Sequence, residues 1–369
     1  MNALPLIVDA HEDLAWNALT FGRDCTRSAD QTRQLEKNTA APAHNGHTLL
    51  GLEDYLRGRV AIIFATLFAA PLRRKQGEWE TQVFADDREA HRLYATQLDH
   101  YRRLADEHAQ FTLIGNGRDV QRVLATWEPA PAAQSAADGR QIGLVPLMEG
   151  ADAIREPAEA AEWMERGLRI VGLAWAGTRY AGGTGEPGPL TEDGRRLLSV
   201  MADIGLILDL AHASDAAYLE ALDRFEGTVL VSHANPRALM KDHAHPERFL
   251  SDEMISRVAE RGGVVGLVPY DGFLKLGWRR GDPKDAVTLE RLVAMIDHVC
   301  QVTGSFAHAG LGTDFDGGLG VDSVPAEIDT IADLPKVGLA LQARGYSEEA
   351  VAAILGLNWI QLLQRGLPA

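Results

Sequence analysis

Charged side chains follow an apolar run near the beginning of the chain, where LPLIV is succeeded by DAHED, residues 9–13. His11 and Asp13 are two residues apart, so their side chains share a face if the strand continues. An imidazole nitrogen and a carboxylate oxygen together suit zinc or a similar divalent ion. Alone, the His-x-Asp pair is a weak signal of a metal site, since a hydrogen-bonded His and a capping Asp would give the same sequence pattern. A metal site therefore requires further ligands elsewhere in the chain.

Three more candidate ligands follow other apolar runs: Glu149 after IGLVPLM, His212 in LDLAHAS and His233 in VLVSHAN. Each has an ordinary explanation, because loop carboxylates are usually solvated and a lone His is commonly a satisfied core residue. All three, however, fall at the carboxyl ends of predicted parallel strands, as His11 and Asp13 do. Barrel enzymes place their chemistry at this face, so we predict one shared metal site.

Two further carboxylates, Asp314 and Asp316, leave the last apolar run in GLGTDFDG. Such a pair could act as ligands, as a proton shuttle or as caps of a turn. We favour Asp314 for proton transfer because it lies on the strand side of the turn. Asp316 is followed by Gly317 and is expected to have a structural role in the turn.

Short apolar runs recur along the chain, each followed by a longer segment of helical period. The runs are LPLIVDAH, RVAIIFATLF, IGLVPLMEG, LRIVGLAW, LILDLAHAS, TVLVSHAN, GVVGLVPY and HAGLGTDFDG. Near-continuous apolar strands between helices are typical of a parallel sheet covered on both faces. They predict an α/β fold, a closed (β/α)8 TIM barrel, in a single domain of residues 1–369.

A long helical insert separates the second and third predicted strands. Residues 77–108 have the pattern of an extended helix, and residues 119–127 have that of another. The Pro/Ala/Ser/Gly-rich residues 128–140 predict a surface loop. Residues 23–50 are polar and have no strand pattern, which predicts a loop over the mouth of the barrel.

The composition restricts the partners and the location. A formal net charge of −16, from 52 acidic against 36 basic residues, disfavours nucleic acid and anionic membranes as partners. The two cysteines, Cys25 and Cys300, cannot form a thiolate-rich zinc site or a disulfide framework, which fits a cytoplasmic location. Neither a signal-peptide pattern nor a membrane-spanning apolar run is present, so we expect no membrane anchor. We expect a homodimer, the commonest assembly.

Several motifs, in order, resemble those of the membrane (renal) dipeptidase family, zinc metallopeptidases of the amidohydrolase superfamily. They are DAHEDLAW, LMEGADAI, DLAHAS, VSHANPRAL, GLGTDFDG and GLNWIQLL. The likeness spans nearly the whole chain and implies a distorted (β/α)8 barrel that holds two Zn²⁺ ions and cleaves the amide bond of dipeptides. Two such ions that bridge one water make hydroxide available near neutral pH to attack the amide.

The resemblance also implies a role for each candidate residue. The implied zinc ligands are His11, Asp13 and Glu149 for one ion, and Glu149, His212 and His233 for the other. Glu149 would bridge the two ions, and Asp314 would transfer the proton. Arg248, in HPERFLSDE, would bind the substrate carboxylate, and its match requires a small insertion around His243 and His245.

The sequence departs from the family pattern at two places. The family usually has Gly and Asn where this chain has Ala10 and Glu12, which leaves the ligands in place. Its fourth strand commonly carries a His that helps to bind the scissile carbonyl, whereas Ala174 and Trp175 stand near that place here. Two alternatives therefore stay open: a hydrolase of another small amide, lactam or N-acyl amino acid, and a non-hydrolytic metal-binding barrel.

Other aromatic residues and histidines are expected to be mainly structural. Trp16, Tyr180 and Tyr270 are candidates for the pocket wall, although aromatic side chains near strand ends more often pack against the core. The histidines assigned to structural positions are His44, His47, His91, His100, His108, His298 and His308.

Overall fold

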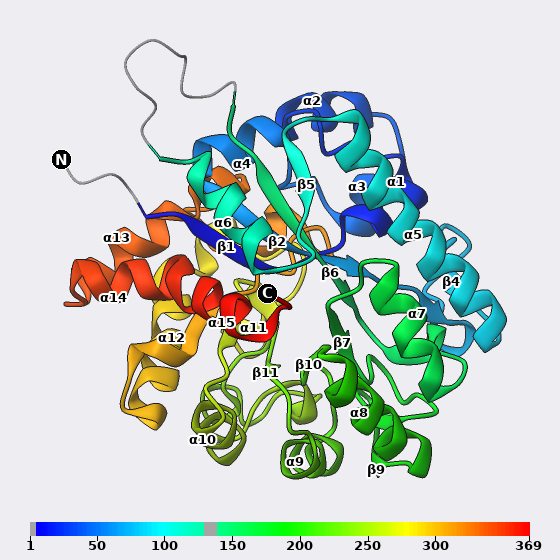
Figure 1. Cartoon of the computed structure of the whole chain (residues 1–369). Helices are drawn as coiled ribbons and strands as arrows, with labels where there is room; N and C mark the ends of the chain where they lie inside the picture. The colour runs from blue at the N-terminus through cyan, green and yellow to red at the C-terminus, as the bar shows by residue number, and fades with distance from the viewer. Residues whose placement is uncertain (1–4, 129–138) are drawn as a thin grey trace.

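Eight parallel strands form a barrel in the computed structural model, which describes residues 5–128 and 139–369 (Figure 1). The strands are β1 (Ile7–Glu12), β2 (Val60–Leu67), β6 (Ile142–Met148), β7 (Ile170–Gly172), β10 (Ile207–Asp209), β11 (Val229–Leu230), β12 (Val265–Leu267) and β13 (Ala309–Leu311). Their order in space is β11-β10-β7-β6-β2-β1-β13-β12. A parallel bridge between Val231 and Val265 joins the two ends of this series, so the predicted (β/α)8 barrel is confirmed.

The strands are buried on both faces, which explains why their sequences are continuously apolar. Every residue of β1, β2 and β6 is buried, because one face points into the barrel and the other lies under helices. Apolar residues from β1, β2, β6, β7, β10 and β11 also pack with α15 (Asn358–Gly366), which crosses the amino-terminal end of the barrel (Figure 1). The carboxyl ends of the strands are left as the open face.

Helices surround the barrel, and several begin or end where the sequence supplies a cap. Their bounds are α1 (Leu14–Phe21), α4 (Leu52–Gly58), α7 (Ala160–Glu165), α8 (Glu192–Ile204), α9 (Asp215–Arg224), α10 (Asp252–Glu260), α11 (Asp271–Leu274), α12 (Leu289–Thr303), α13 (Pro335–Ala343) and α14 (Glu348–Ala352). The Thr191 side chain, for example, accepts a hydrogen bond from the Gly194 N–H at the start of α8, and Gly205 ends that helix with φ 79°. These are the usual signals at the two ends of a helix.

The insert after β2 differs from its prediction in two respects. Its main helix, α5 (Asp87–Glu107), begins ten residues later than predicted, because the Asp86 side chain caps it by accepting from two backbone N–H groups. The residues before it include β3 (Ala70–Pro71) and β4 (Val83–Phe84), which pair with each other. An unpredicted strand, β5 (Phe111–Leu113), pairs with β6.

The second predicted helix of the insert is present as α6 (Gly117–Ala125). Most of the predicted surface loop at residues 128–140 lies outside the described residues. No helix of the described chain is long and apolar enough to cross a membrane.

Residues 23–50 contain no strand, but they are not a simple loop. They form α2 (Ala29–Glu36) and α3 (Ala41–Asn45). The prediction of a loop was wrong because the Ser28 and Gln31 side chains form a capping box that starts α2. The segment lies at the open face, since the Asn45 side chain donates to the Asp316 backbone oxygen after β13.

Gly266 in β12 packs directly against the Ser232 carbonyl oxygen, and a substitution tests this close contact. A Cβ on Gly266 would lie 1.9 Å from the Ser232 carbonyl oxygen. Gly266→Ala should therefore lower the free energy of unfolding by about 2 kcal/mol or more, as expected of a core that must rearrange. Chemical denaturation measures this change.

The matched control is Gly188→Ala, whose Cβ would be no closer than 3.7 Å to any neighbour. Equal stability of the two variants would contradict the close approach at Ser232.

Candidate metal centre and active-site pocket

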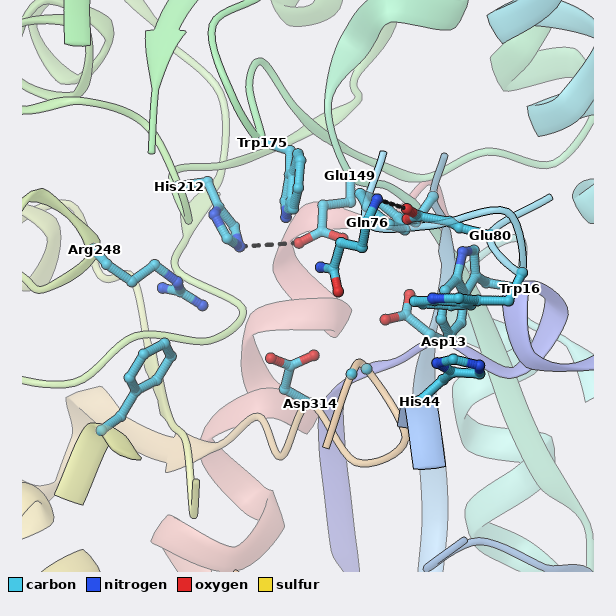
Figure 2. Close-up of a pocket in the computed structure, with 15 residues that line it drawn as sticks. Asp13, Trp16, His44, Gln76, Glu80, Glu149, Trp175, His212, Arg248 and Asp314 are labelled. Atoms are coloured by element: carbon cyan, nitrogen blue, oxygen red, sulfur yellow. Dashed lines mark hydrogen bonds and ion pairs between the residues drawn. The ribbon is translucent and has the colours of Figure 1, made fainter. Parts of the chain in front are cut away.

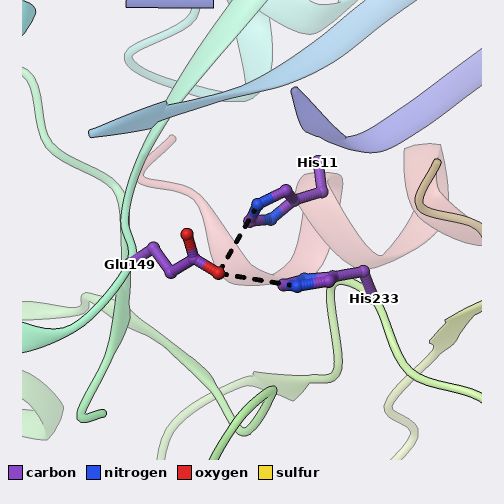
Figure 3. A group of neighbouring side chains, drawn as sticks. All are labelled: His11, Glu149 and His233. Carbon is purple, nitrogen blue, oxygen red and sulfur yellow. Dashed lines mark ion pairs between the residues drawn. The ribbon is translucent and has the colours of Figure 1, made fainter. Parts of the chain in front are cut away.

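Three imidazole rings converge on one oxygen of Glu149. Glu149 Oε1 lies 3.1 Å from His212 Nε2, 3.5 Å from His233 Nε2 and 3.6 Å from His11 Nε2. Figure 3 shows His11 of β1 and His233 of the segment after β11, both directed at this carboxylate. Since zinc bonds to nitrogen and oxygen are each about 2 Å long, two ligands of one ion lie at about such separations.

A second group of possible ligand atoms adjoins the first. His11, Asp13 and Asp314 place one ligand atom each within 4.8 Å of the others, as do His11, Glu149 and His233. Asp314 Oδ1 is 3.9 Å from His11 Nε2. The five predicted ligands and the predicted proton-transfer residue therefore meet at the open face of the barrel.

The polar atoms of the centre fit divalent cations. His11 is fully buried, and neither of its ring nitrogens has a hydrogen-bond partner among the described residues. His212 Nε2 and His233 Nε2 lie only 3.0 Å apart. Buried nitrogens are seldom left unpaired, because the loss of hydration is costly. Cations bound between the nitrogens and the carboxylates would satisfy both groups.

The protonation equilibria reflect this crowding. Burial lowers the pKa of His11, but the charges of Glu149, Asp13 and Asp314 outweigh burial and raise that pKa to about 10. Burial raises the pKa of Asp13 to about 6 and also raises that of Asp314. Burial lowers the pKa of His212 to about 4. A centre that holds several buried carboxylates is one that positive ions would stabilise.

Hydrogen bonds behind two histidines orient their rings. The Ser232 hydroxyl lies 2.6 Å from Asp209 Oδ2 and 2.8 Å from His233 Nδ1. When it donates to the carboxylate, it accepts from the Nδ1–H of His233, which leaves the Nε2 lone pair facing the centre. Thr184 Oγ1 lies 2.9 Å from His212 Nδ1. Such contacts fix the tautomer of a metal-binding histidine.

The insert helix α5 supports the centre from behind. The Tyr94 hydroxyl donates to the Glu149 backbone oxygen at 2.8 Å, and the Tyr101 hydroxyl donates to the Thr66 backbone oxygen at 2.8 Å. The Thr66 side chain in turn donates to the Asp13 carboxylate. The insert thus holds two of the candidate ligands in place.

Asp314 and Asp316 have the same backbone conformation but different surroundings. Both adopt the left-handed conformation, with φ 58° and 62°, which is uncommon outside glycine. Asp314 faces the pocket (Figure 2). Asp316 is buried, pairs with Arg23 at 3.0 Å and accepts the Leu49 N–H at 2.9 Å. It ties the segment before α4 to the turn after β13.

A pocket opens over the centre and has unlike ends (Figure 2). Arg248 is buried at one end, where its Nη1 donates to the His233 backbone oxygen at 2.9 Å and its Nη2 has no partner among the described residues. The other end is formed by Trp16 together with Trp79 and Glu80 from the insert. Nothing in the sequence pattern pointed to these two insert residues.

The whole chain matches one protein family. Residues 1–365 match the family described as membrane dipeptidase, peptidase family M19. The chain belongs to the membrane dipeptidase family. The resemblance stated from the motifs is therefore confirmed.

Two relatives are similar in sequence to part of this chain, and a solved structure shares its fold. An uncharacterized dipeptidase of Schizosaccharomyces pombe is 32% identical over 47% of this chain and 39% of its own length, and a dipeptidase of Claviceps purpurea is 31% identical over 54% and 44%. The chain therefore spans less than half the length of these two relatives. A metallopeptidase from Rhodobacter sphaeroides, liganded with a phosphinate mimic of the dipeptide L-Ala-D-Ala, is similar in fold, with 22% identity, a TM-score of 0.77 and coverage of 99% of this chain and 100% of that one.

Of the other residues considered from the sequence of this family member, some line the pocket and others do not. Trp16 lines the pocket, whereas Tyr180 is buried and donates to the Ile154 backbone oxygen. His44, expected to be structural in a polar loop, lies in α3 and lines the pocket, where its ring stacks on Trp79 at 4.7 Å between centroids. That pairing joins two segments far apart in the sequence, so no local pattern could predict it.

The contact between Thr184 and His212 can be removed without changing any candidate metal ligand. Thr184→Val removes the hydroxyl at 2.9 Å from Nδ1 and should weaken zinc binding about tenfold or more, as loss of such partners usually does. Competition with a chelator measures the affinity.

Thr184→Ser keeps the hydroxyl and should bind zinc nearly as the unaltered chain does. If Thr184→Val also kept full affinity, His212 would not depend on this contact.

Proposed function

We propose that this protein is a binuclear zinc hydrolase that cleaves the amide bond of dipeptides. The observation that carries this proposal is the convergence of three buried imidazoles on Glu149 Oε1, beside the group of His11, Asp13 and Asp314. In this proposal, one ion is held by His11, Asp13 and Glu149, and the other by Glu149, His212 and His233. Bound ions would supply Lewis acidity to the carbonyl and an activated water.

Asp314 is proposed to move the proton. It projects into the pocket beside the candidate ligands but makes no side-chain hydrogen bond among the described residues, and its side chain is 17% exposed. Burial raises its pKa, which makes the carboxylate a better base. It can accept the proton of the attacking water and deliver it to the leaving nitrogen, as a general acid and base must.

Arg248 is proposed to bind the substrate carboxylate. Its side chain is buried, and its Nη2 has no partner among the described residues although it lies at the pocket. A guanidinium with free donors binds a carboxylate in a fixed orientation. Arg248 lines the same pocket as the candidate metal ligands. A substrate whose carboxylate binds Arg248 would therefore have its neighbouring amide close to those ligands. This arrangement favours short substrates with a free carboxyl end.

The alternative of another small amide is favoured by one observation. Trp175 lines the pocket near the place of the fourth-strand His, and its ring centroid is 6.2 Å from that of His212. An indole has a single N–H donor in a larger ring than an imidazole, so the hydrogen bond to the substrate carbonyl would differ from the one that a histidine donates. Lactams and N-acyl amino acids are the compounds to compare with dipeptides.

Metal dependence is the first measurable consequence. The purified chain should contain about two zinc ions, as expected of a site with a bridging carboxylate, and should cleave a panel of L,L and L,D dipeptides. A chelator should abolish cleavage, and added zinc should restore it. Elemental analysis and a cleavage assay test both expectations.

His212→Ala should lose zinc and activity, whereas His47→Ala, at an exposed site on the surface, should keep both. Cleavage that survives complete removal of the metal would refute the proposal.

Asp314→Asn tests the proton-transfer role separately from metal binding. The amide cannot take up the proton, so kcat should fall by about 10²- to 10⁴-fold, while the zinc content and KM stay within a few-fold. Steady-state kinetics and elemental analysis measure these quantities.

Asp322→Asn is the matched control, because that side chain is 66% exposed and should leave kcat unchanged. A kcat of Asp314→Asn close to that of the control would remove Asp314 from the reaction.

A further inference from the structure

A second cavity opens beside the metal centre, with a volume of about 240 Å³. Its wall includes four nitrogen-rich side chains and two aromatic ones: Arg74, His243, His245, Arg248, Trp175 and Phe273. None of the residues that line it carries a carboxylate. In a chain of net charge −16, a cavity with this lining is unusual and indicates an anionic ligand. We call it the basic pocket.

The carboxylates behind the wall do not neutralise it. Glu186 is shared by two guanidiniums, with Arg73 Nη2 at 2.8 Å and Arg74 Nε at 2.9 Å. Glu247 accepts the Gly185 N–H at 3.0 Å and lies 3.6 Å from His245 Nδ1. With Arg73, which lies behind the wall, the three arginines Arg73, Arg74 and Arg248 outnumber the two carboxylates, Glu186 and Glu247, so the excess charge is positive.

Several donors of the wall are free to bind a ligand. Arg74 uses Nε for Glu186 and Nη2 for the Gly185 backbone oxygen, while its Nη1 makes no hydrogen bond among the described residues. His243 Nδ1 accepts the His245 N–H at 3.1 Å, so the neutral ring carries its proton on Nε2. That nitrogen also has no partner among the described residues, and it is a donor.

The basic pocket adjoins the proposed substrate site. Arg248, Trp175 and His212 line both this cavity and the pocket over the metal centre. Figure 2 shows Arg248 and His212 on the side away from Trp16 and Glu80. A dipeptide whose α-carboxylate meets Arg248 and whose amide lies at the centre would direct the side chain of its second residue into the basic pocket.

We propose that the basic pocket selects dipeptides whose second residue carries a carboxylate side chain, aspartate or glutamate. This inference rests on the proposed function for the orientation of the substrate. The side-chain carboxylate is bound by Arg74 Nη1 and by the His243 and His245 rings, separately from the α-carboxylate on Arg248. Charge-assisted hydrogen bonds of this kind discriminate an acid from its uncharged amide.

Pairs of substrates that differ only in charge provide the test. The value of kcat/KM should be about tenfold higher for Ala-Asp than for Ala-Asn, and likewise for Ala-Glu than for Ala-Gln, because only one substrate of each pair carries a side-chain carboxylate. Each comparison is made with the L and with the D configuration at the second residue. Equal values within each pair would overturn the proposal, as would a preference for Ala-Phe, which would assign the cavity to aromatic side chains.

The adjacent arginine provides a matched control. Arg73 and Arg74 both pair with Glu186, but only Arg74 lines the basic pocket. Arg74→Ala should remove the preference for acidic residues, so that kcat/KM for Ala-Asp falls about tenfold, to the value for Ala-Asn. Arg73→Ala should keep the preference, and an equal loss in both variants would show that Glu186 or the local fold is responsible.

A binding measurement separates this inference from the proposed function. Calorimetry of the zinc-loaded protein should give a several-fold lower Kd for free aspartate than for asparagine, with the difference lost in Arg74→Ala and kept in Arg73→Ala. If aspartate binds in this way but no dipeptide is cleaved, only the proposed function fails. If dipeptides are cleaved and aspartate has no advantage in binding or turnover, only the basic pocket fails.

Discussion

The structure depends on the burial of three imidazoles and several carboxylates around one oxygen of Glu149. Groups of this kind lose their hydration when the barrel closes, and the desolvation penalty is large unless opposite charge compensates it. The unpartnered ring nitrogens of His11 and the close approach of His212 Nε2 and His233 Nε2 leave that compensation to bound cations. Folding of the open face and formation of the metal centre are therefore linked.

The surrounding elements hold this arrangement from three directions. Asp9 joins β1 to β13, because its carboxylate accepts the Thr313 N–H at 2.7 Å and the Thr313 hydroxyl at 2.5 Å. The insert helix α5 supports Glu149 through Tyr94. The segment before α4 reaches over the top, where Arg23 pairs with Asp316. Each contact links residues far apart in the chain, so the rigidity of the centre comes from the closed barrel.

The cleft over the centre is asymmetric, and this asymmetry gives a substrate a direction. Trp16 and Glu80 lie at one end, and Arg248 with the basic pocket lies at the other. A molecule with a carboxylate at one end therefore has one favourable orientation. Trp175 lines both cavities, near the place where the family pattern has a histidine, so this chain departs from that pattern where the two cavities meet.

The sequence alone determined the barrel and the residues at its open face. Eight continuous apolar runs had to be strands buried on both sides, and parallel strands bring their carboxyl ends to one face. For this reason the sequence alone predicts that His11, Asp13, Glu149, His212 and His233 lie together. The start of α5, the strand β5 and the helices α2 and α3 were not predicted, because a single cap or a short tertiary pairing sets them.

Only the tertiary structure decided which side chains surround that centre. Trp79 and Glu80 belong to an insert, and His44 to a segment that reads as a polar loop. They reach the pocket because Trp79 stacks between Phe21 and His44. The basic pocket likewise joins Arg74 to His243 and His245. The periodicity of apolar residues in the sequence indicates which residues are buried. Packing between distant segments determines which residues become neighbours, and these neighbours set the polarity of the cleft.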